Sequence, residues 1–264
     1  MTRGPVLGWP ATRWLAHRGA GKLAPENTLA AFRLGAAHGY RAFECDVKLS
    51  ADGVPFLLHD ATLDRTSNGH GNAGDLPWAK LSQLDAGSWH SRAYAGEPLP
   101  TLQAIAAFVQ GNGLALNIEI KPTPGVEALT GEVVAQHAVR LWADAALPPL
   151  LSSFQPDALA AAQRTAPQLP RALLLDSLRP GWADEARALA CTAVVTHFKL
   201  MDAALLAQLH AAGWLAFAYT VNQPADAQRL LALGVDGLIT DAVNQFAPAS
   251  ACAGAWWPGL GCGA

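Results

Sequence analysis

Three apolar segments of the chain carry ionisable side chains at or just beyond their ends. The first segment is followed directly by a histidine and an arginine. The other two each lead into a pair of ionisable residues that stand two positions apart. The residues concerned are His17 and Arg18, Glu44 and Asp46, and Glu119 and Lys121. These groups can form one reaction centre only if the fold brings the three segment ends together.

The carboxylates in this set suit the binding of a divalent cation. Because side chains alternate along a strand, Glu44 and Asp46 share one face of their segment. The neighbouring Cys45 and Ile120 are apolar and suit a layer that faces helices. Glu119 is the third carboxylate of the group. Three carboxylates that converge repel one another unless a cation or protons lie between them. Hard oxygen ligands favour Mg²⁺ or Ca²⁺, with Mn²⁺ also suited, over Zn²⁺. The alternative for one carboxylate alone is an ion pair with a nearby arginine or lysine.

Two histidines are candidates for proton transfer beside a phosphate group. Arg18 offers a planar fork of donors that suits phosphate, and Lys121 adds a point charge. His17 stands beside Arg18, and His59 is followed by Asp60, which would orient its ring. One histidine alone would be weak evidence, but two of them near a positive site indicate paired general acid and base catalysis.

Motifs for several other chemistries are absent from the sequence. The chain has no GxSxG, P-loop or GxGxxG segment, so a serine hydrolase, an NTPase and a Rossmann fold have no support. No serine or cysteine at the expected site pairs with a histidine. The nucleophile is therefore expected to be a metal-activated water or a hydroxyl of the substrate itself. Among the remaining histidines, which we interpret as structural or exposed, His197 is the next candidate because it follows an expected strand.

Short apolar runs alternate with helical patterns along most of the chain. Strands that alternate with helices require parallel pairing through right-handed crossovers. Eight such units predict a closed (β/α)8 TIM barrel, with a doubly wound open sheet as the alternative. The expected strands cover residues 14–16, 42–49, 114–120, 150–153, 172–176, 193–196, 215–220 and 235–240, and the expected helices cover 28–38, 101–109, 126–142, 157–165, 183–190, 202–212 and 224–233.

A glycine- and proline-rich segment, residues 47–100, interrupts this rhythm after the second strand. Within it, Val54–His59 predicts a short extra strand that returns from a turn at Asp52 and Gly53. Connections of this length in a compact domain usually serve a function, so we expect an insertion over the mouth of the barrel. Residues 248–264 have no period and are expected to form an irregular tail.

The composition fits one barrel domain over residues 1–264, because 51% of the residues are hydrophobic. A formal net charge of −3 gives no reason to expect a nucleic-acid partner. No apolar stretch is long enough for stable membrane insertion, and the first residues do not resemble a signal peptide. The four cysteines lack a CxxC spacing. These features predict free thiols and a cytoplasmic location, with a Cys252–Cys262 disulfide as the alternative for the tail.

Short motifs from Trp14 to Asp241 form a set that is specific as a whole, although none is specific alone. They are HRG at 17–19, PENT at 25–28, ECDV at 44–47, SADGVP at 50–55, HD at 59–60, LDRTSNG at 63–69, PTL at 100–102, NIEIKP at 117–122, TVN at 220–222 and GVDGLITD at 234–241. Together they resemble the glycerophosphodiester phosphodiesterase family, in its cytoplasmic bacterial type.

The resemblance implies a TIM barrel with a small insertion after the second strand. It also implies a hydrolase that converts glycerophosphodiesters to glycerol 3-phosphate and an alcohol, through a cyclic glycerol phosphate. The implied roles are Mg²⁺ or Ca²⁺ binding by Glu44, Asp46 and Glu119, acid–base catalysis by His17 and His59, and phosphate binding by Arg18 and Lys121. Tyr219 stands where many members have tryptophan, so the substrate pocket is expected to differ there.

Two other functions remain open at this point. A phospholipase that acts on lysolipids or phosphoinositides would use a similar barrel and paired histidines, and exposed tryptophans would favour it. Trp78, Trp89, Trp256 and Trp257 are the candidates. A binding module that holds a phosphodiester without cleaving it is the alternative outside enzymes.

Overall fold

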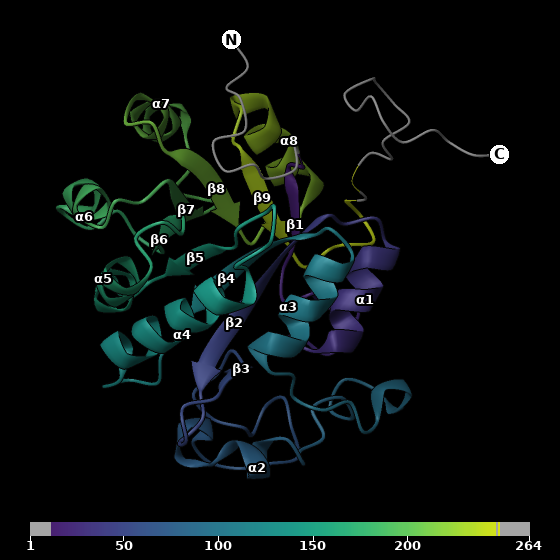
Figure 1. Ribbon diagram of the computed structural model, residues 1–264. Helices are drawn as coiled ribbons and strands as arrows, with labels where there is room; N and C mark the ends of the chain where they lie inside the picture. The colour runs from purple at the N-terminus through teal and green to yellow at the C-terminus, as the bar shows by residue number, and fades with distance from the viewer. Residues whose placement is uncertain (1–11, 247, 249–264) are drawn as a thin grey trace.

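Eight parallel strands close into a barrel in the computed structural model, which describes residues 12–246 and 248 (Figure 1). Strand β1 (Trp14–Ala16) pairs in parallel with both β2 (Ala42–Leu49) and β9 (Gly237–Thr240), so the sheet has no free edge there. This closure confirms the TIM barrel and rules out the open sheet. The remaining barrel strands are β4 (Ala115–Ile120), β5 (Leu150–Ser153), β6 (Arg171–Leu175), β7 (Ala193–His197) and β8 (Leu215–Tyr219).

Helices surround this barrel, and their ends follow the expected capping residues. The Asp202 side chain accepts a hydrogen bond of 2.8 Å from Leu205 N at the start of α7 (Ala203–Ala211), and Gly234, with φ 95°, ends α8 (Pro224–Leu233). Among the described residues no helix follows β9. The helices of the outer layer are α1 (Leu29–Ala37), α3 (Leu102–Gly111), α4 (Glu127–Leu141), α5 (Pro156–Thr165), α6 (Trp182–Ala188), α7 (Ala203–Ala211) and α8 (Pro224–Leu233).

The apolar core has one layer inside the barrel and another between strands and helices. Leu15, Leu174 and Phe217 belong to the inner layer. Cys45 and Ile120 lie instead in the outer layer, as the alternation along β2 and β4 predicts. The polar residues on either side of Cys45 and of Ile120 in the sequence therefore face the inside of the barrel, at its C-terminal end.

The segment between β2 and α3 forms the insertion, beyond the C-terminal end of β2 (Figure 1). It contains β3 (Pro55–Leu57), which is antiparallel to β2, the helix α2 (Trp78–Leu81) and two single 3₁₀ turns. Its own small core includes Phe56, Leu63 and Leu81. The extra strand is shorter than the expected 54–59, because the chain leaves the sheet after Leu58 N donates to Asp46 O. His59 therefore lies just beyond the strand rather than in it.

Two further expectations concern C-terminal residues, most of which lie outside the part of the chain that the structure describes. The irregular tail, 248–264, and the Cys252–Cys262 alternative lie almost entirely outside the described residues, whereas Cys45 and Cys191 are free thiols. Within the part that the structure describes, none of the helices combines the length and apolar character that a membrane crossing requires.

Candidate active site

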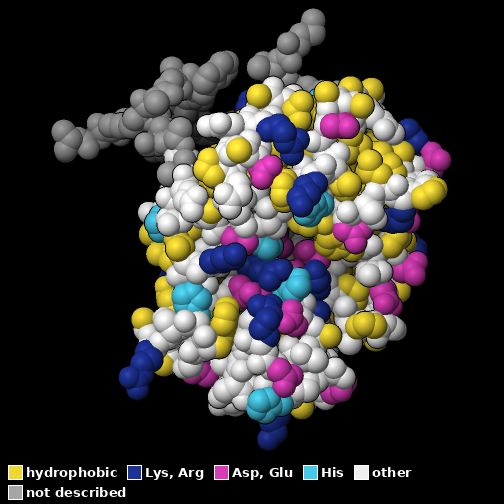
Figure 2. All heavy atoms as spheres, turned by 180° about the vertical axis from the view of Figure 1, so that it is seen from behind, with side chains coloured by type: hydrophobic (Ala, Val, Ile, Leu, Met, Phe, Trp, Pro, Cys, Tyr) yellow, Lys and Arg dark blue, Asp and Glu magenta, His cyan; other side chains and the backbone are white. Residues whose placement is uncertain are grey.

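A cavity of about 210 Å³ opens at the C-terminal end of the barrel. Figure 2 shows basic, acidic and histidine side chains gathered around a hollow on this face of the molecule. Part of the lining is charged and another part is largely apolar. The cavity is lined by His17, Arg18, Glu44, His59, Asn117, Glu119, Lys121, Phe154, Leu174, Tyr219, Thr220 and Ile239.

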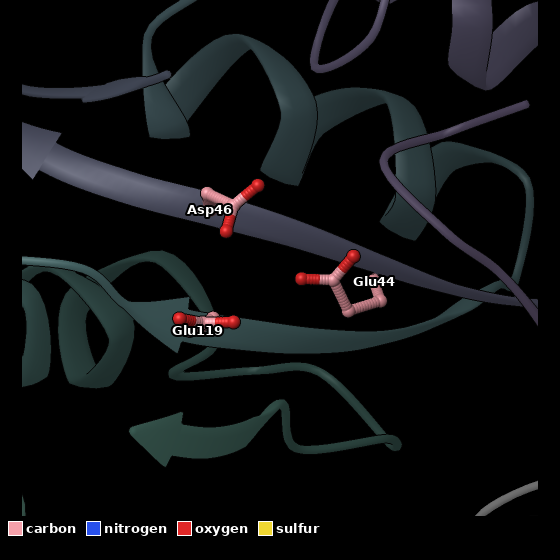
Figure 3. A group of neighbouring side chains, drawn as sticks. All are labelled: Glu44, Asp46 and Glu119. Carbon is pink, nitrogen blue, oxygen red and sulfur yellow. The ribbon is translucent and has the colours of Figure 1, made fainter. Parts of the chain in front are cut away.

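Three buried carboxylates lie at this end of the barrel. Glu44 and Asp46 extend from β2, and Glu119 extends from β4, where it stands opposite Asp46 in the strand register. One oxygen from each residue can be chosen so that all three lie within 4.8 Å of one another. Figure 3 shows the three carboxylate groups turned toward a shared space between the two strands. The structure thus brings together the acidic residues that the spacing predicted.

The charge of this group is only partly neutralised by the protein. Burial and the charge of Asp46 raise the pKa values of Glu44 and Glu119 above their ordinary range. Burial would raise the pKa of Asp46 too, but Arg18 and Lys121 outweigh it and lower that pKa. Two carboxyl groups therefore resist ionisation at a site where the third is charged.

These residues fit a divalent cation. Glu44 Oε1 and Asp46 Oδ1 are buried and make no hydrogen bond within the described structure. Buried carboxylate oxygens that accept no hydrogen bond are costly unless an ion or a proton satisfies them. A cation held by Glu44, Asp46 and Glu119 would also relieve the mutual repulsion, and the all-oxygen set suits a hard metal ion.

His17 is held in place by a carboxylate from the other end of the chain. Its Nδ1–H donates to Asp241 Oδ1 at 2.6 Å, and its Nε2 lies 3.7 Å from Glu44 Oε2. Asn222 Nδ2 donates to the second oxygen of Asp241 at 2.9 Å. Burial would lower the pKa of His17, but the Glu44 and Asp241 carboxylates outweigh it and raise that pKa.

His59 reaches the same cavity from the insertion. Its Nδ1–H donates to Asp60 Oδ1 at 2.7 Å, the contact that their adjacency predicted. Burial lowers the pKa of His59, and Arg18 and Lys121 add to this effect. The two histidines therefore have opposite pKa shifts, an arrangement that suits separate acid and base roles.

Arg18 and Lys121 also lie at the cavity, where they pair with the carboxylates. Arg18 Nε is 3.1 Å from Asp46 Oδ2, and Arg18 Nη1 donates to Glu26 Oε1 at 2.8 Å. Lys121 Nζ donates to Glu119 Oε1 at 2.7 Å and lies 3.7 Å from Asp46 Oδ1. Both cations border the cavity, so a bound anion would meet them next to the acidic group.

The apolar part of the lining contains Tyr219, at the end of β8. Its ring meets the Phe154 ring edge-on, with centroids 5.7 Å apart, and its hydroxyl donates to Leu175 O at 3.3 Å. His197 ends β7, one residue beyond the expected strand, and its ring packs against Tyr219 with centroids 5.8 Å apart. His197 is not among the residues that line the cavity.

Several supporting residues were not assigned roles from the sequence. Asn27 Nδ2 donates to Asp46 Oδ2 at 2.8 Å, and Asn27 Oδ1 accepts from Asp46 N at 3.1 Å. Asp241 was missed in the same way, although it directly follows the last strand. In a closed barrel the last strand must lie next to the first strand. The predicted barrel could therefore have indicated that Asp241, which follows the last strand, lies close to His17, which follows the first.

Comparisons with known proteins show which family the chain resembles. The model of the glycerophosphoryl diester phosphodiesterase family matches residues 17–245. A glycerophosphodiester phosphodiesterase of Caldanaerobacter subterraneus subsp. tengcongensis is 32% identical over 232 residues, which cover 86% of this chain and 93% of that protein. A phosphodiesterase of Oleispira antarctica, solved with the product sn-glycerol-3-phosphate, has a TM-score of 0.82 and 34% identity, with 88% of this chain and 94% of that chain covered. A glycerophosphodiester phosphodiesterase of Agrobacterium tumefaciens has a TM-score of 0.73 and 26% identity, with 89% and 99% covered.

The fold and the cavity therefore define a TIM-barrel phosphoric diester hydrolase. The chain belongs to the glycerophosphoryl diester phosphodiesterase family, which the family model matches over most of its length.

Proposed function

We propose that this enzyme hydrolyses glycerophosphodiesters to glycerol 3-phosphate and an alcohol, and that it requires Mg²⁺ or Ca²⁺. The observation that carries the proposal is one cavity lined by two carboxylates, two histidines and two cations of the protein, with Asp46 completing the carboxylate group beside it. The related Oleispira antarctica phosphodiesterase, solved with sn-glycerol-3-phosphate, supports the same product. The cytoplasmic location and the absence of a nucleic-acid partner stay predictions from the sequence.

Each side chain has a proposed task at the phosphate. Glu44, Asp46 and Glu119 hold the cation. When bound, a divalent cation supplies charge stabilisation for the phosphoryl oxygens. Arg18 and Lys121 bind the same oxygens and stabilise the negative charge that builds on them. The remaining two side chains, His17 and His59, transfer protons.

The proposed nucleophile is the hydroxyl at carbon 2 of the substrate glycerol. One histidine takes its proton while the oxygen bonds to phosphorus, and the bond from phosphorus to the alcohol breaks. The other histidine gives a proton to the leaving alcohol, which yields a cyclic glycerol phosphate. Water then opens the ring with the histidine roles reversed, so the protons balance over one turnover. An oriented hydroxyl competes well with water because its effective concentration is high.

A substrate panel tests the proposed function. With Mg²⁺, Ca²⁺, Mn²⁺ or a chelator, we would measure the glycerol 3-phosphate released from glycerophosphocholine, glycerophosphoethanolamine and glycerophosphoglycerol. The acylated glycerol 3-phosphate released from a lysophospholipid would be measured in parallel. We expect turnover of the glycerophosphodiesters with a divalent cation and none with the chelator. Binding without turnover would identify a binding module, and a preference for the lysophospholipid would identify a phospholipase.

Of the four tryptophans considered for the lysolipid alternative, the structure describes Trp78 and Trp89, whereas Trp256 and Trp257 lie outside the described residues. Trp78 packs against Phe56 in the insertion, with ring centroids 5.9 Å apart. Trp89 is 40% exposed, but its indole N–H donates to Ala86 O at 2.8 Å. These two residues do not make an apolar surface at the cavity, whose lining includes neither of them.

Replacing either histidine by alanine is expected to slow the chemical step. A positioned acid or base contributes about 10²–10⁴-fold, so His17→Ala and His59→Ala should each lower kcat by at least about 100-fold with a smaller change in KM. The measurement is steady-state kinetics on glycerophosphocholine. His38→Ala, at the C-cap position of α1 and outside the cavity lining, is the matched control. Wild-type kinetics in His59→Ala would make His59 structural and would direct attention to His197.

A further inference from the structure

A single arginine of the insertion binds two carboxylates from different parts of the chain. Arg65 Nε donates to Asp60 Oδ2 at 2.6 Å, and Arg65 Nη2 donates to Asp60 Oδ1 at 3.0 Å. On its other edge, Arg65 Nη1 donates to Glu26 Oε2 at 2.8 Å and Nη2 donates to Glu26 Oε1 at 2.8 Å. Each carboxylate thus receives two parallel hydrogen bonds from one rigid planar group.

Each of these two carboxylates also accepts a hydrogen bond from a residue that lines the cavity. Asp60 accepts the Nδ1–H of His59, and Glu26 accepts from Arg18. Glu26 lies in the loop between β1 and α1, and its side chain is only 14% exposed. Arg65 therefore connects the His59 loop of the insertion to a nearly buried anchor on the barrel.

The contribution of Arg65 to folding should be small, which leaves geometry as its main effect. Its side chain is 45% exposed, so solvent screens its ion pairs and limits what they add to stability. His59, by contrast, lies beyond the end of β3, outside the strand pairing that fixes its neighbours. The hydrogen bonds from Arg65 hold the pKa of Asp60 well below its usual range, so that carboxylate stays charged and accepts the hydrogen bond from His59 Nδ1–H.

We propose that Arg65 is a positioning residue, which fixes Asp60 relative to Glu26 and thereby orients His59 in the cavity. Glu26 keeps its bond to Arg18 when Arg65 is absent, so the effect runs through His59 rather than Arg18. A lysine cannot replace Arg65, because an ammonium group lacks the planar fork that holds two carboxylates at once. The proposal rests on the proposed function for its kinetic consequence but not for its geometry.

The kinetic test compares Arg65→Met and Arg65→Lys with the wild type and with Arg92→Met, an exposed arginine of the same insertion. Small misplacements of a catalytic group cost up to about 100-fold, so both Arg65 variants should lose roughly 10- to 100-fold in kcat with little change in KM. Arg92→Met should behave as wild type, and Tm should change little in every variant. Full activity in Arg65→Lys would overturn the proposal, because charge alone would then suffice.

A double variant separates positioning from a general structural effect. If Arg65 acts through His59, then Arg65→Met should cause no further loss of kcat in a His59→Ala background. The same fold-loss in both backgrounds would mean that Arg65 acts elsewhere, and the proposal would fail.

A measurement without substrate distinguishes failure of this proposal from failure of the proposed function. Imidazole signals of ¹⁵N-labelled histidine would be recorded by NMR, with His59 assigned from its alanine variant. The His59 Nδ1–H signal should be sharp in the wild type and in Arg92→Met, and it should broaden or shift in Arg65→Met while the His17 signal stays unchanged. An unaltered His59 signal in Arg65→Met would refute the positioning role, whatever the enzyme hydrolyses.

Discussion

Replacing Glu44 by glutamine should reduce metal-dependent turnover to the level of the chelated enzyme. Losing a residue that only supports a metal ligand typically costs about 10–100-fold in metal affinity, so losing a charged ligand should cost more than about 100-fold. Isothermal titration calorimetry with Mg²⁺, Ca²⁺ and Mn²⁺ measures the loss of metal affinity directly. The metal-free variant should melt no lower than the metal-free wild type, because one of three buried, mutually repelling carboxylates has become neutral.

Glu132→Gln provides the matched control, since Glu132 is an exposed residue of α4 whose side chain bonds to Gln136. It should retain wild-type turnover and metal affinity. If Glu44→Gln also kept wild-type affinity for all three ions, the carboxylate group would not be the metal site. The assignment of Glu44, Asp46 and Glu119 would then have to be abandoned.

Blocking the 2-hydroxyl of the substrate as a methyl ether should nearly abolish cleavage without abolishing binding. Oriented intramolecular groups reach effective concentrations of about 10⁵–10⁸ M against about 55 M for water, so turnover should fall by at least about 1,000-fold. The rates of glycerophosphocholine and its 2-O-methyl ether would be compared under single-turnover conditions. Competition by the ether against the parent substrate would report its binding.

A cyclic phosphate should also accumulate transiently with the parent substrate, and ³¹P NMR would detect it. The control is a synthetic cyclic glycerol phosphate, which the enzyme should open to glycerol 3-phosphate. Cleavage of the methyl ether at a rate close to that of the parent would exclude the cyclic route. Direct attack by water on the diester would then be the mechanism.

The barrel was predictable because short apolar strands alternate regularly with helices of clear periodicity. Each expected barrel strand and outer helix agrees with the structure to within two residues at either end. Most differences at helix ends arise from capping residues, such as Thr28 and Asp202, which the pattern counts as helix. The helix α2 and the 3₁₀ turns of the insertion were not predicted, since elements of three or four residues complete no more than about one helical turn.

The site was predictable where residues close together in the sequence determine its geometry. The shared face of Glu44 and Asp46, and the contact of His59 with Asp60, both follow from short sequence separations. The bonds from His17 to Asp241 and from Arg65 to Glu26 join residues far apart in the chain. No local pattern reports such contacts, because they depend on barrel closure and on the path of the insertion.

Pairing of β1 with β9 has a consequence for when the enzyme becomes active during synthesis. His17 N donates to Thr240 O at 3.0 Å, and its ring binds Asp241, 224 positions further along the chain. A nascent chain can therefore expose His17 early, but it cannot fix the ring until β9 has been made and has closed the barrel. Incomplete chains that lack the last strand would carry every proposed metal ligand and both histidines without a correctly held His17. We therefore expect the His17 orientation that the proposed cleavage needs only in chains whose barrel has closed.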